Sequence, residues 1–181
     1  MTDDPLRKPT ALIVDDEQTH REILRRRVEP YFFVIEASTS EEAIAIMKGV
    51  WVDVLFSDNN LPVREGPASE LPRVDGKEMV RLLRFEAGYK GIIIFASASA
   101  SQPGVYMEMA DAGADEILVK PFKGERVIGV LRDLFGNRLL TDKEREERLG
   151  KRQRRQEREM KRKEAAANRL RRVLEGIVTK R

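Results

Sequence analysis

Short apolar segments alternate with longer amphipathic segments along residues 10–137 of this chain. Each apolar segment has about the length of a β-strand and is rich in Val, Ile, Leu or Phe. Their apolar residues run almost without interruption, which is typical of strands that are covered on both faces. The expected strands are residues 11–14, 31–37, 52–57, 91–96 and 116–119.

The segments between these strands have the apolar spacing of α-helices. In the last of them the apolar residues recur every three to four positions and form one hydrophobic stripe. Ser40 precedes another such stripe and is expected to be its N-cap. Five strands that alternate with five helices predict an α/β fold, a five-stranded parallel sheet with helices on both faces. The expected helices are residues 19–28, 40–47, 75–87, 105–112 and 125–135.

The ends of the expected strands carry the candidate site residues. In a parallel α/β sheet, ligands bind outside the carboxyl ends of the strands. The first strand leads into Asp15-Asp16, the third into Asp58, the fourth into Ser97 and the fifth into Lys120. We therefore expect these side chains to lie close together at one edge of the sheet.

The residue types at this edge suit phosphoryl transfer. Three neighbouring carboxylates repel one another unless a cation joins them, and Mg²⁺ prefers such oxygen ligands. The Lys120 ammonium and the Ser97 hydroxyl add the groups that bind the oxygens of a transferring phosphoryl group. A carboxylate can itself accept that group, and Asp58 is the candidate because its strand is expected in the middle of the sheet.

Five motifs give residues 9–137 a resemblance to a known family. They are LIVDDE (12–17), VDVLFSDNNLP (52–62), VDGKEM (74–79), IIIFASA (92–98) and ADAGADEILVKPF (110–122). With these motifs the segment resembles the receiver domain of two-component response regulators. The resemblance implies a flavodoxin-like fold and a phosphorylatable signalling switch that is not an enzyme.

The resemblance also implies roles for the acidic residues. Asp58 would be the phosphoacceptor and a Mg²⁺ ligand, with Asp15, Asp16 and the backbone carbonyl of Asn60 as further ligands. The phosphoryl donor would be a phosphohistidine on a sensor histidine kinase or on a histidine phosphotransfer protein.

The resemblance also implies roles for Lys120 and Ser97, whereas the expectation for His20 comes from its position as a lone histidine early in a predicted helix. Lys120 would contact the phosphoryl group, and its bond to Pro121 is expected to be cis. Ser97 would be the switch hydroxyl, with Ser99 as the alternative. His20, the single histidine, is expected to be solvated or to cap a helix, outside the site.

Two features depart from the pattern of the family. Residues 63–73 form an insertion after Pro62, either a tolerated surface loop or an element that affects phosphodonor access. Ile117 stands where the family has a switch aromatic. Haloacid-dehalogenase-like phosphohydrolases use similar groups and are an alternative, but their nucleophile lies in an Asp-x-Asp pattern on the first strand, which is absent here.

Charge divides the chain into two parts. Residues 139–181 contain 16 of the 34 Lys and Arg and 8 of the 31 Asp and Glu, so they carry +8 and residues 1–138 carry −5. We expect a receiver domain in residues 1–138 and a basic helical extension in residues 139–181. The chain has no cysteine, which excludes disulfides and thiolate metal sites. It also has no apolar run long enough to span a membrane, so a cytoplasmic location is expected.

Residues 141–178 lack proline and are rich in helix-forming residues, which predicts one long helix, separate from or continuous with the helix at 125–135. Thr141 and Glu144 have the spacing of a capping box at its start. Apolar residues at heptad spacing, most frequent in residues 165–178, indicate a weak coiled coil and hence a homodimer or a partner helix. Its basic clusters offer an alternative, nucleic-acid binding, although the interleaved acids dilute their field.

Overall fold

The structure is a computed structural model that describes residue 4 and residues 6–63, 74–99 and 102–178. Met1–Leu139 and Leu140–Arg181 form two compact units. Residues 64–73, which make up most of the expected insertion, lie outside the described residues. The side chains of residues 168–178, which hold most of the expected heptad positions near the C-terminus, lie outside them too.

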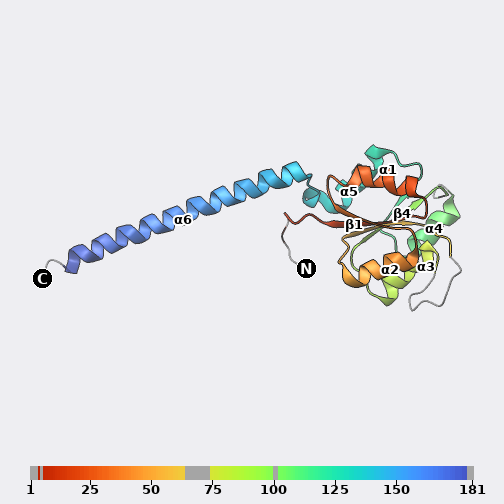
Figure 1. Cartoon of the computed structure of the whole chain (residues 1–181), viewed down its shortest axis with the longest axis horizontal. Helices are drawn as coiled ribbons and strands as arrows, with labels where there is room; N and C mark the ends of the chain where they lie inside the picture. The colour runs from red at the N-terminus through yellow and green to blue at the C-terminus, as the bar shows by residue number, and fades with distance from the viewer. Residues whose placement is uncertain (1–3, 5, 64–73, 100–101, 179–181) are drawn as a thin grey trace. The chain divides into compact units, whose positions relative to one another are not determined.

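The first unit is built around a five-stranded parallel sheet (Figure 1). Its strands are β1 (Thr10–Val14), β2 (Phe33–Ala37), β3 (Val54–Asp58), β4 (Ile92–Ser97) and β5 (Glu116–Val119). Their order is β2-β1-β3-β4-β5, and all neighbouring pairs are parallel. The predicted fold class is confirmed, and β3 is the middle strand, so its carboxyl end lies at the centre of the sheet edge.

Helices cover both faces of this sheet. They are α1 (Gln18–Val28), α2 (Ser40–Gly49), α3 (Gly76–Arg81), α4 (Pro103–Asp111) and α5 (Gly124–Phe135). Residues of α1 and α5 pack on one face, and residues of α2, α3 and α4 pack on the other (Figure 1). The right-handed crossover of parallel strands places helices on the two faces in this way.

Successive residues of a strand belong to different cores. On β3, Val54 and Phe56 pack with the residues of α1 and α5, whereas Leu55 packs with those of α2, α3 and α4. All three side chains are buried. Because both faces are covered, a strand of this sheet needs apolar residues at every position, which explains the uninterrupted apolar runs in the sequence.

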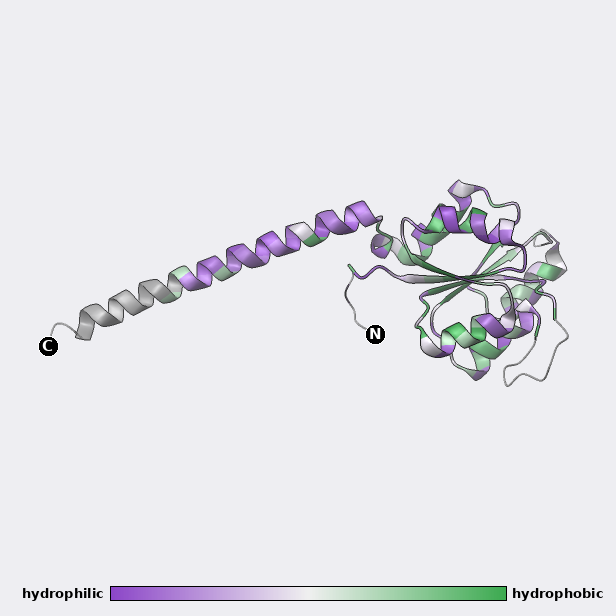
Figure 2. Ribbon diagram, in the orientation of Figure 1, coloured by the Kyte–Doolittle hydropathy of each residue, from purple (hydrophilic) through white to green (hydrophobic). Residues whose placement is uncertain are grey.

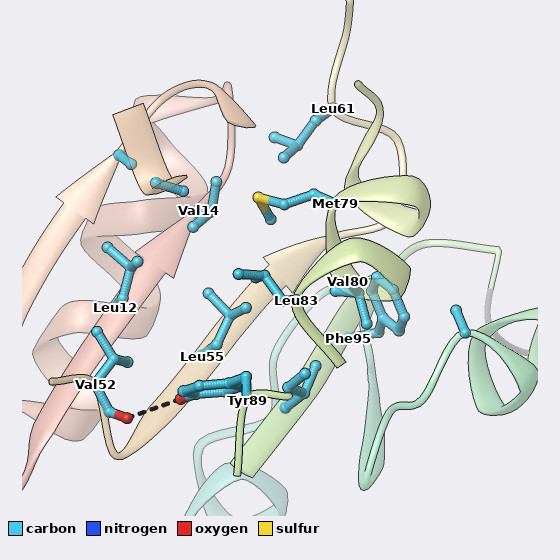
Figure 3. Close-up of a cluster of buried hydrophobic side chains, with 14 of the residues drawn as sticks. Leu12, Val14, Val52, Leu55, Leu61, Met79, Val80, Leu83, Tyr89 and Phe95 are labelled. Atoms are coloured by element: carbon cyan, nitrogen blue, oxygen red, sulfur yellow. Dashed lines mark hydrogen bonds between the residues drawn. The ribbon is translucent and has the colours of Figure 1, made fainter. Parts of the chain in front are cut away.

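Figure 3 shows the core between the sheet and α3. Leu55 and Phe95 from the strands contact this cluster together with Met79 from α3. Tyr89 closes the cluster, and its hydroxyl donates a hydrogen bond of 2.8 Å to the carbonyl oxygen of Val52. The ring therefore fills apolar space while its one polar group is satisfied.

The helix after β3 is less regular than predicted. The α-helix α3 ends at Arg81, and Leu82–Glu86 form a π-helical turn in which the N–H of Ala87 donates to the Leu82 carbonyl. The spacing of apolar residues cannot distinguish these two helix types over so short a segment. The segment predicted as one helix over 75–87 therefore contains two kinds of helical turn.

The predicted N-cap of α2 was wrong by one residue. Thr39 is the cap, and its hydroxyl accepts a hydrogen bond of 3.1 Å from the N–H of Glu42. Ser40 is buried instead, and its hydroxyl accepts from the N–H of Val74 at 3.3 Å. Adjacent Thr and Ser are both good caps, so tertiary contacts decide which one takes the position.

The second unit contains one long helix, α6 (Asp142–Val178). The predicted capping box at its start is confirmed, since the hydroxyl of Thr141 accepts from the N–H of Glu144 and the Glu144 carboxylate accepts from the N–H of Thr141. Helix α6 is not continuous with α5, because Gly136 has φ +54° and opens a short 3₁₀ turn. Within the described residues, no helix is long and apolar enough to cross a membrane.

Arg84 in the π-helical turn makes hydrogen bonds to two loops of the first unit, the loop before β4 and the loop before β5. Its Nη1 donates to the carbonyl oxygens of Tyr89 and Gly91 at 2.8 and 3.1 Å. Its Nε donates to the carbonyl of Gly113 at 3.0 Å, and its Nη2 pairs with Asp115 at 2.6 Å. The side chain is only 18% exposed, so these carbonyl groups depend on the guanidinium for their hydrogen bonds.

We expect Arg84→Lys to lower the free energy of unfolding by about 2–3 kcal/mol, because an ammonium cannot serve four acceptors in a fork and would leave buried carbonyls unpaired. Urea denaturation of the full chain measures this loss. Arg81→Lys is the matched control: Arg81 is 55% exposed, makes an ion pair of 3.5 Å with Glu78, and should lose less than about 0.5 kcal/mol. Equal losses in the two variants would contradict the role given to the Arg84 fork.

Candidate functional site

Polar residues from four strands reach the carboxyl edge of the sheet. Asp15 directly follows β1, Asp58 is the last residue of β3, Ser97 is the last of β4, and Lys120 directly follows β5. Asp15, Asp58 and Ser97 are buried. Because β1, β3, β4 and β5 are successive neighbours in the sheet, residues far apart in the chain come to one edge.

The Lys120 ammonium joins the two buried carboxylates at this edge. Its Nζ lies 2.7 Å from Oδ2 of Asp15 and 3.1 Å from Oδ2 of Asp58. The three side chains are between 5% and 11% exposed, so each charge depends on the others for compensation. The Lys120–Pro121 bond is cis, as the resemblance implies.

His20 also belongs to this cluster, and the expectation that it lies outside the site was wrong. Its Nδ1 is 3.2 Å from Nζ of Lys120 and 3.4 Å from Oδ1 of Asp15. Since an ammonium only donates hydrogen bonds, Nδ1 is the acceptor in its contact with Lys120. The one available signal was position: His20 lies in the first turn of α1, the helix that starts at the edge where β1 ends.

With His20, the Lys120 ammonium has three neighbours for its three N–H groups. Two are the carboxylates of Asp15, which follows β1, and of Asp58, which ends β3, and the third is the His20 imidazole on α1. The lysine side chain is 7% exposed and is therefore held by protein groups rather than by solvent.

Burial raises the pKa of Asp58 above its ordinary value of 3.8. The charge of Lys120 opposes this shift, and the neighbouring charge of Asp15 adds to it. A raised pKa means that the ionised carboxylate costs free energy in the folded protein. A cation bound beside Asp58 would reduce that cost.

The acidic residues at this edge fit a hard divalent cation. Asp15, Asp16 and Asp58 each place one carboxylate oxygen within 4.8 Å of the others. Asp16 is exposed, so the group is open to solvent on its side. Only oxygen ligands are offered, as Mg²⁺ prefers. Asn60 donates its N–H to Oδ1 of Asp58 at 3.4 Å, and the use of its backbone carbonyl as a ligand stays a prediction.

The motif VDGKEM packs the start of α3 directly on the backbone of Asp58. A Cβ atom at Gly76 would lie 1.8 Å from the carbonyl oxygen of Asp58, so only glycine permits this approach. Asp75 caps the helix and accepts a hydrogen bond of 2.8 Å from the N–H of Glu78. The Asp-Gly pair therefore fixes where the helix begins against the candidate acceptor.

The two candidate switch hydroxyls contact each other. Oγ of Ser97 lies 3.1 Å from Oγ of Ser99 and accepts a hydrogen bond of 3.2 Å from the Ser99 N–H. Ser97 ends β4, the strand that pairs with β3, whereas Ser99 follows the strand. The assignment of the switch role to Ser97 stays a prediction.

A hollow of about 510 Å³ opens beside Lys120. Tyr106 of α4, Ile117 and Val119 of β5 and Arg126 of α5 contribute to its lining. Tyr106 and Val119 are each 49% exposed, while Ile117 is buried. The chain thus has the aliphatic Ile117 where the resemblance implies a switch aromatic, and the exposed aromatic Tyr106 also lines this hollow.

Comparisons with known proteins agree with this geometry. The family described as "Response regulator receiver domain" matches residues 11–132. Response regulator MprA of Mycobacterium ulcerans is 31% identical over 134 residues, which are 74% of this chain and 53% of the relative. Chemotaxis protein CheY of Halobacterium salinarum is 28% identical over 128 residues, which are 69% of this chain and 95% of the relative.

Other relatives extend beyond the matched region. Hybrid signal transduction histidine kinase D of Dictyostelium discoideum is 23% identical over 121 residues, which are 67% of this chain and only 7% of the relative. This chain therefore spans a small part of that protein and about half of MprA. Among solved structures, chemotaxis protein CheY4 of Vibrio cholerae is similar with a TM-score of 0.60 and 27% identity, over 70% of this chain and 98% of that one.

The family match, the relatives and the sheet order agree on one assignment for the first unit. The strand-end cluster lies within the matched residues 11–132. The chain belongs to the response regulator receiver domain family and contains the receiver domain of a two-component response regulator.

Proposed function

We propose that this chain is a phosphorylatable switch that accepts a phosphoryl group on Asp58 from a phosphohistidine. The buried Lys120 ammonium, shared by Asp15 and Asp58, is the observation that carries the proposal. Residues 1–138 would act as the receiver domain and residues 139–181 as a basic helical extension. A relative named as a hybrid histidine kinase supports a sensor histidine kinase or a histidine phosphotransfer protein as the donor.

In the proposed reaction, a carboxylate oxygen of Asp58 attacks the phosphorus of the phosphohistidine. The bond between phosphorus and the imidazole nitrogen breaks, and that nitrogen takes a proton from solvent, so that the donor leaves as neutral imidazole. Lys120 is already within hydrogen-bond distance of Asp58, so it is placed to donate to an oxygen of the transferred group. Ser97 would exchange its contact with Ser99 for another phosphoryl oxygen.

Mg²⁺ is the cofactor that we propose for this site. Asp15, Asp16, Asp58 and the backbone carbonyl of Asn60 would hold it. When bound, it supplies positive charge that offsets the carboxylates and the phosphoryl oxygens. The clustered carboxylate oxygens support this part of the proposal, because Asp15, Asp16 and Asp58 bring three acidic groups together. Burial raises the pKa of Asp58, so a bound cation would offset the cost of its ionised form.

The output of the switch is proposed to be protein–protein contact. The hollow beside Lys120 presents exposed apolar surface from Tyr106 and Val119, and Lys120 itself contributes to its lining. A change at the phosphorylation site can therefore alter a surface that a partner reads. On α6, Leu149 and Met160 are exposed and have heptad spacing, which supports a homodimer or a partner helix at that unit.

Labelling with a small phosphodonor such as acetyl phosphate tests the acceptor directly. We expect Mg²⁺-dependent labelling of the full chain and none in Asp58→Asn, because an amide cannot form the acyl phosphate. Mass spectrometry after the reaction measures the labelled fraction. Asp133→Asn is the control, since Asp133 is exposed on α5 and its loss should leave labelling unchanged. Undiminished labelling of Asp58→Asn would overturn the assignment.

The raised pKa of Asp58 predicts how stability depends on pH without divalent cations. Between 3.8 and the raised value, the folded state holds a proton that the unfolded state has lost, so stability falls as pH rises through this window. Asp58→Asn removes this loss. In a chelator, the variant should therefore be more stable than the wild type at neutral pH, with a gain that shrinks as pH approaches 3.8.

Urea denaturation across this pH range measures the gain. Added Mg²⁺ should then stabilise the wild type more than Asp58→Asn, because the variant lacks one carboxylate ligand. The opposite result, in which Asp58→Asn is less stable than the wild type at neutral pH without cations, would contradict this prediction. It would show that attraction to Lys120 outweighs the cost of burying the ionised Asp58 carboxylate.

His20 is proposed as a residue that positions Lys120. We expect His20→Leu to slow labelling by acetyl phosphate by about threefold or more, because the lysine loses one of its three neighbours and hence part of its fixed geometry. His20→Asn keeps a side-chain acceptor and should label at a rate closer to that of the wild type. The labelling rates of the three proteins are measured at equal Mg²⁺ concentration. A wild-type rate in His20→Leu would show that His20 does not position Lys120.

A further inference from the structure

Helix α6 gathers its basic residues on one side. Between Lys151 and Lys163 the chain has eight Lys or Arg and two Glu, a net charge of +6. Successive residues of an α-helix are rotated by about 100° around its axis. One half of the circumference therefore carries six basic residues and no acid in this stretch. We name it the basic face, and its residues are Lys151, Arg154, Arg155, Arg158, Lys161 and Arg162.

The other half of the same stretch has no net charge. Arg152 and Lys163 are balanced there by Glu157 and Glu159, and the remaining side chains are two Gln and Met160. Within residues 151–163, the acids that interleave with basic residues in the sequence thus lie off the basic face once the helix forms. Glu147, four residues before Lys151, lies in line with that face. Within residues 151–163, these acids therefore dilute the positive field of the basic face less than their order in the sequence suggests.

The basic face is open to solvent within its own unit. Every side chain from Lys151 to Ala165 is exposed, and this part of α6 is mostly hydrophilic (Figure 2). Arg155 makes an ion pair of 3.1 Å with Glu159 at the border of the face, but the two side chains are 84% and 55% exposed. Such an exposed pair is weak, and Arg155 can exchange it for another anion.

The spacing of these charges suits the backbone of a nucleic-acid duplex. From Lys151 to Arg162 the helix rises about 17 Å, which gives about one positive charge per 3 Å along the face. Duplex DNA carries one negative charge per about 1.7 Å of its axis. Four of the six residues are Arg, whose guanidinium binds phosphate oxygens in pairs.

Other polyanionic partners fit this helix less well. A helix that lies on a membrane needs an apolar face opposite the basic one, and here that half carries Gln, Glu and a single Met. A protein interface depends on apolar or aromatic anchors, and the basic face has none. Single strands are bound by aromatic stacking, and no aromatic residue follows Phe135.

We propose that the basic face of α6 binds double-stranded DNA through its phosphates, without reading base sequence. An α-helix fits the major groove of B-form DNA, whereas the major groove of an A-form RNA duplex is too narrow for it. This activity is separate from phosphorylation, because none of its residues belongs to the strand-end cluster. It gives the second unit a ligand of its own.

The test is binding of the full chain to a fluorescent random-sequence DNA duplex, followed by anisotropy at several salt concentrations. Neutralising up to six phosphates predicts that log K falls with log salt with a slope of about −3 to −5. Arg154→Gln with Arg158→Gln removes two charges from the centre of the face and should make the slope shallower by about two.

Arg152→Gln with Lys163→Gln is the matched control. It removes the same net charge from the opposite half, replaces basic residues with the same helix former, and should change the slope by less than one. Circular dichroism of both variants checks that the helix remains. Equal losses of affinity in the two variants would show that DNA is attracted by the net charge of the helix and not by the basic face. That result would overturn the proposal.

Three further outcomes would also overturn it. They are no binding to the duplex at low salt, equal affinity for an RNA duplex, and equal or tighter binding to vesicles that contain anionic lipid. DNA binding is measured on the unphosphorylated chain, and labelling by acetyl phosphate is measured without DNA, so a failure of either experiment leaves the other interpretable.

Discussion

A buried ammonium shared by two carboxylates organises the edge of the receiver sheet. Lys120 follows β5, Asp15 follows β1 and Asp58 ends β3, so the interaction depends on the parallel order of the whole sheet. Unpaired, each of these charges would be expensive to bury. Two opposing effects therefore set the pKa of Asp58: burial raises it, and the charge of Lys120 limits that rise.

Helix α3 and the π-helical turn that follows it form a segment that is fixed at both ends. At its start, Gly76 lets the backbone of α3 approach the carbonyl of Asp58. At its far end, Arg84 in the π-helical turn binds the Gly113 carbonyl and Asp115 in the loop before β5. The helix thus links the edge that carries the acidic cluster to the opposite edge of the sheet, where Tyr89 closes the core.

The two units of the chain are stabilised by different physical means. The first buries apolar strands between two helical layers and carries an excess of acidic residues. In the second, the described side chains from Lys151 onward are exposed, and the helix depends on helix-forming residues, a capping box and local ion pairs. A surface of that kind is stabilised by a partner of opposite charge. The exposed basic helix therefore favours a function in binding.

Residue patterns along the chain predicted the fold class, the strand ends that carry the cluster and the start of α6, because apolar periodicity and capping chemistry are local properties. The contact of His20 with Lys120, and the capping of α2 by Thr39 rather than Ser40, became known from the folded structure. Each of these depends on how separate segments pack, and residue spacing along one segment does not contain that information. The basic face of α6 is intermediate: its residues are visible in the sequence, but helix geometry separates them from the acids.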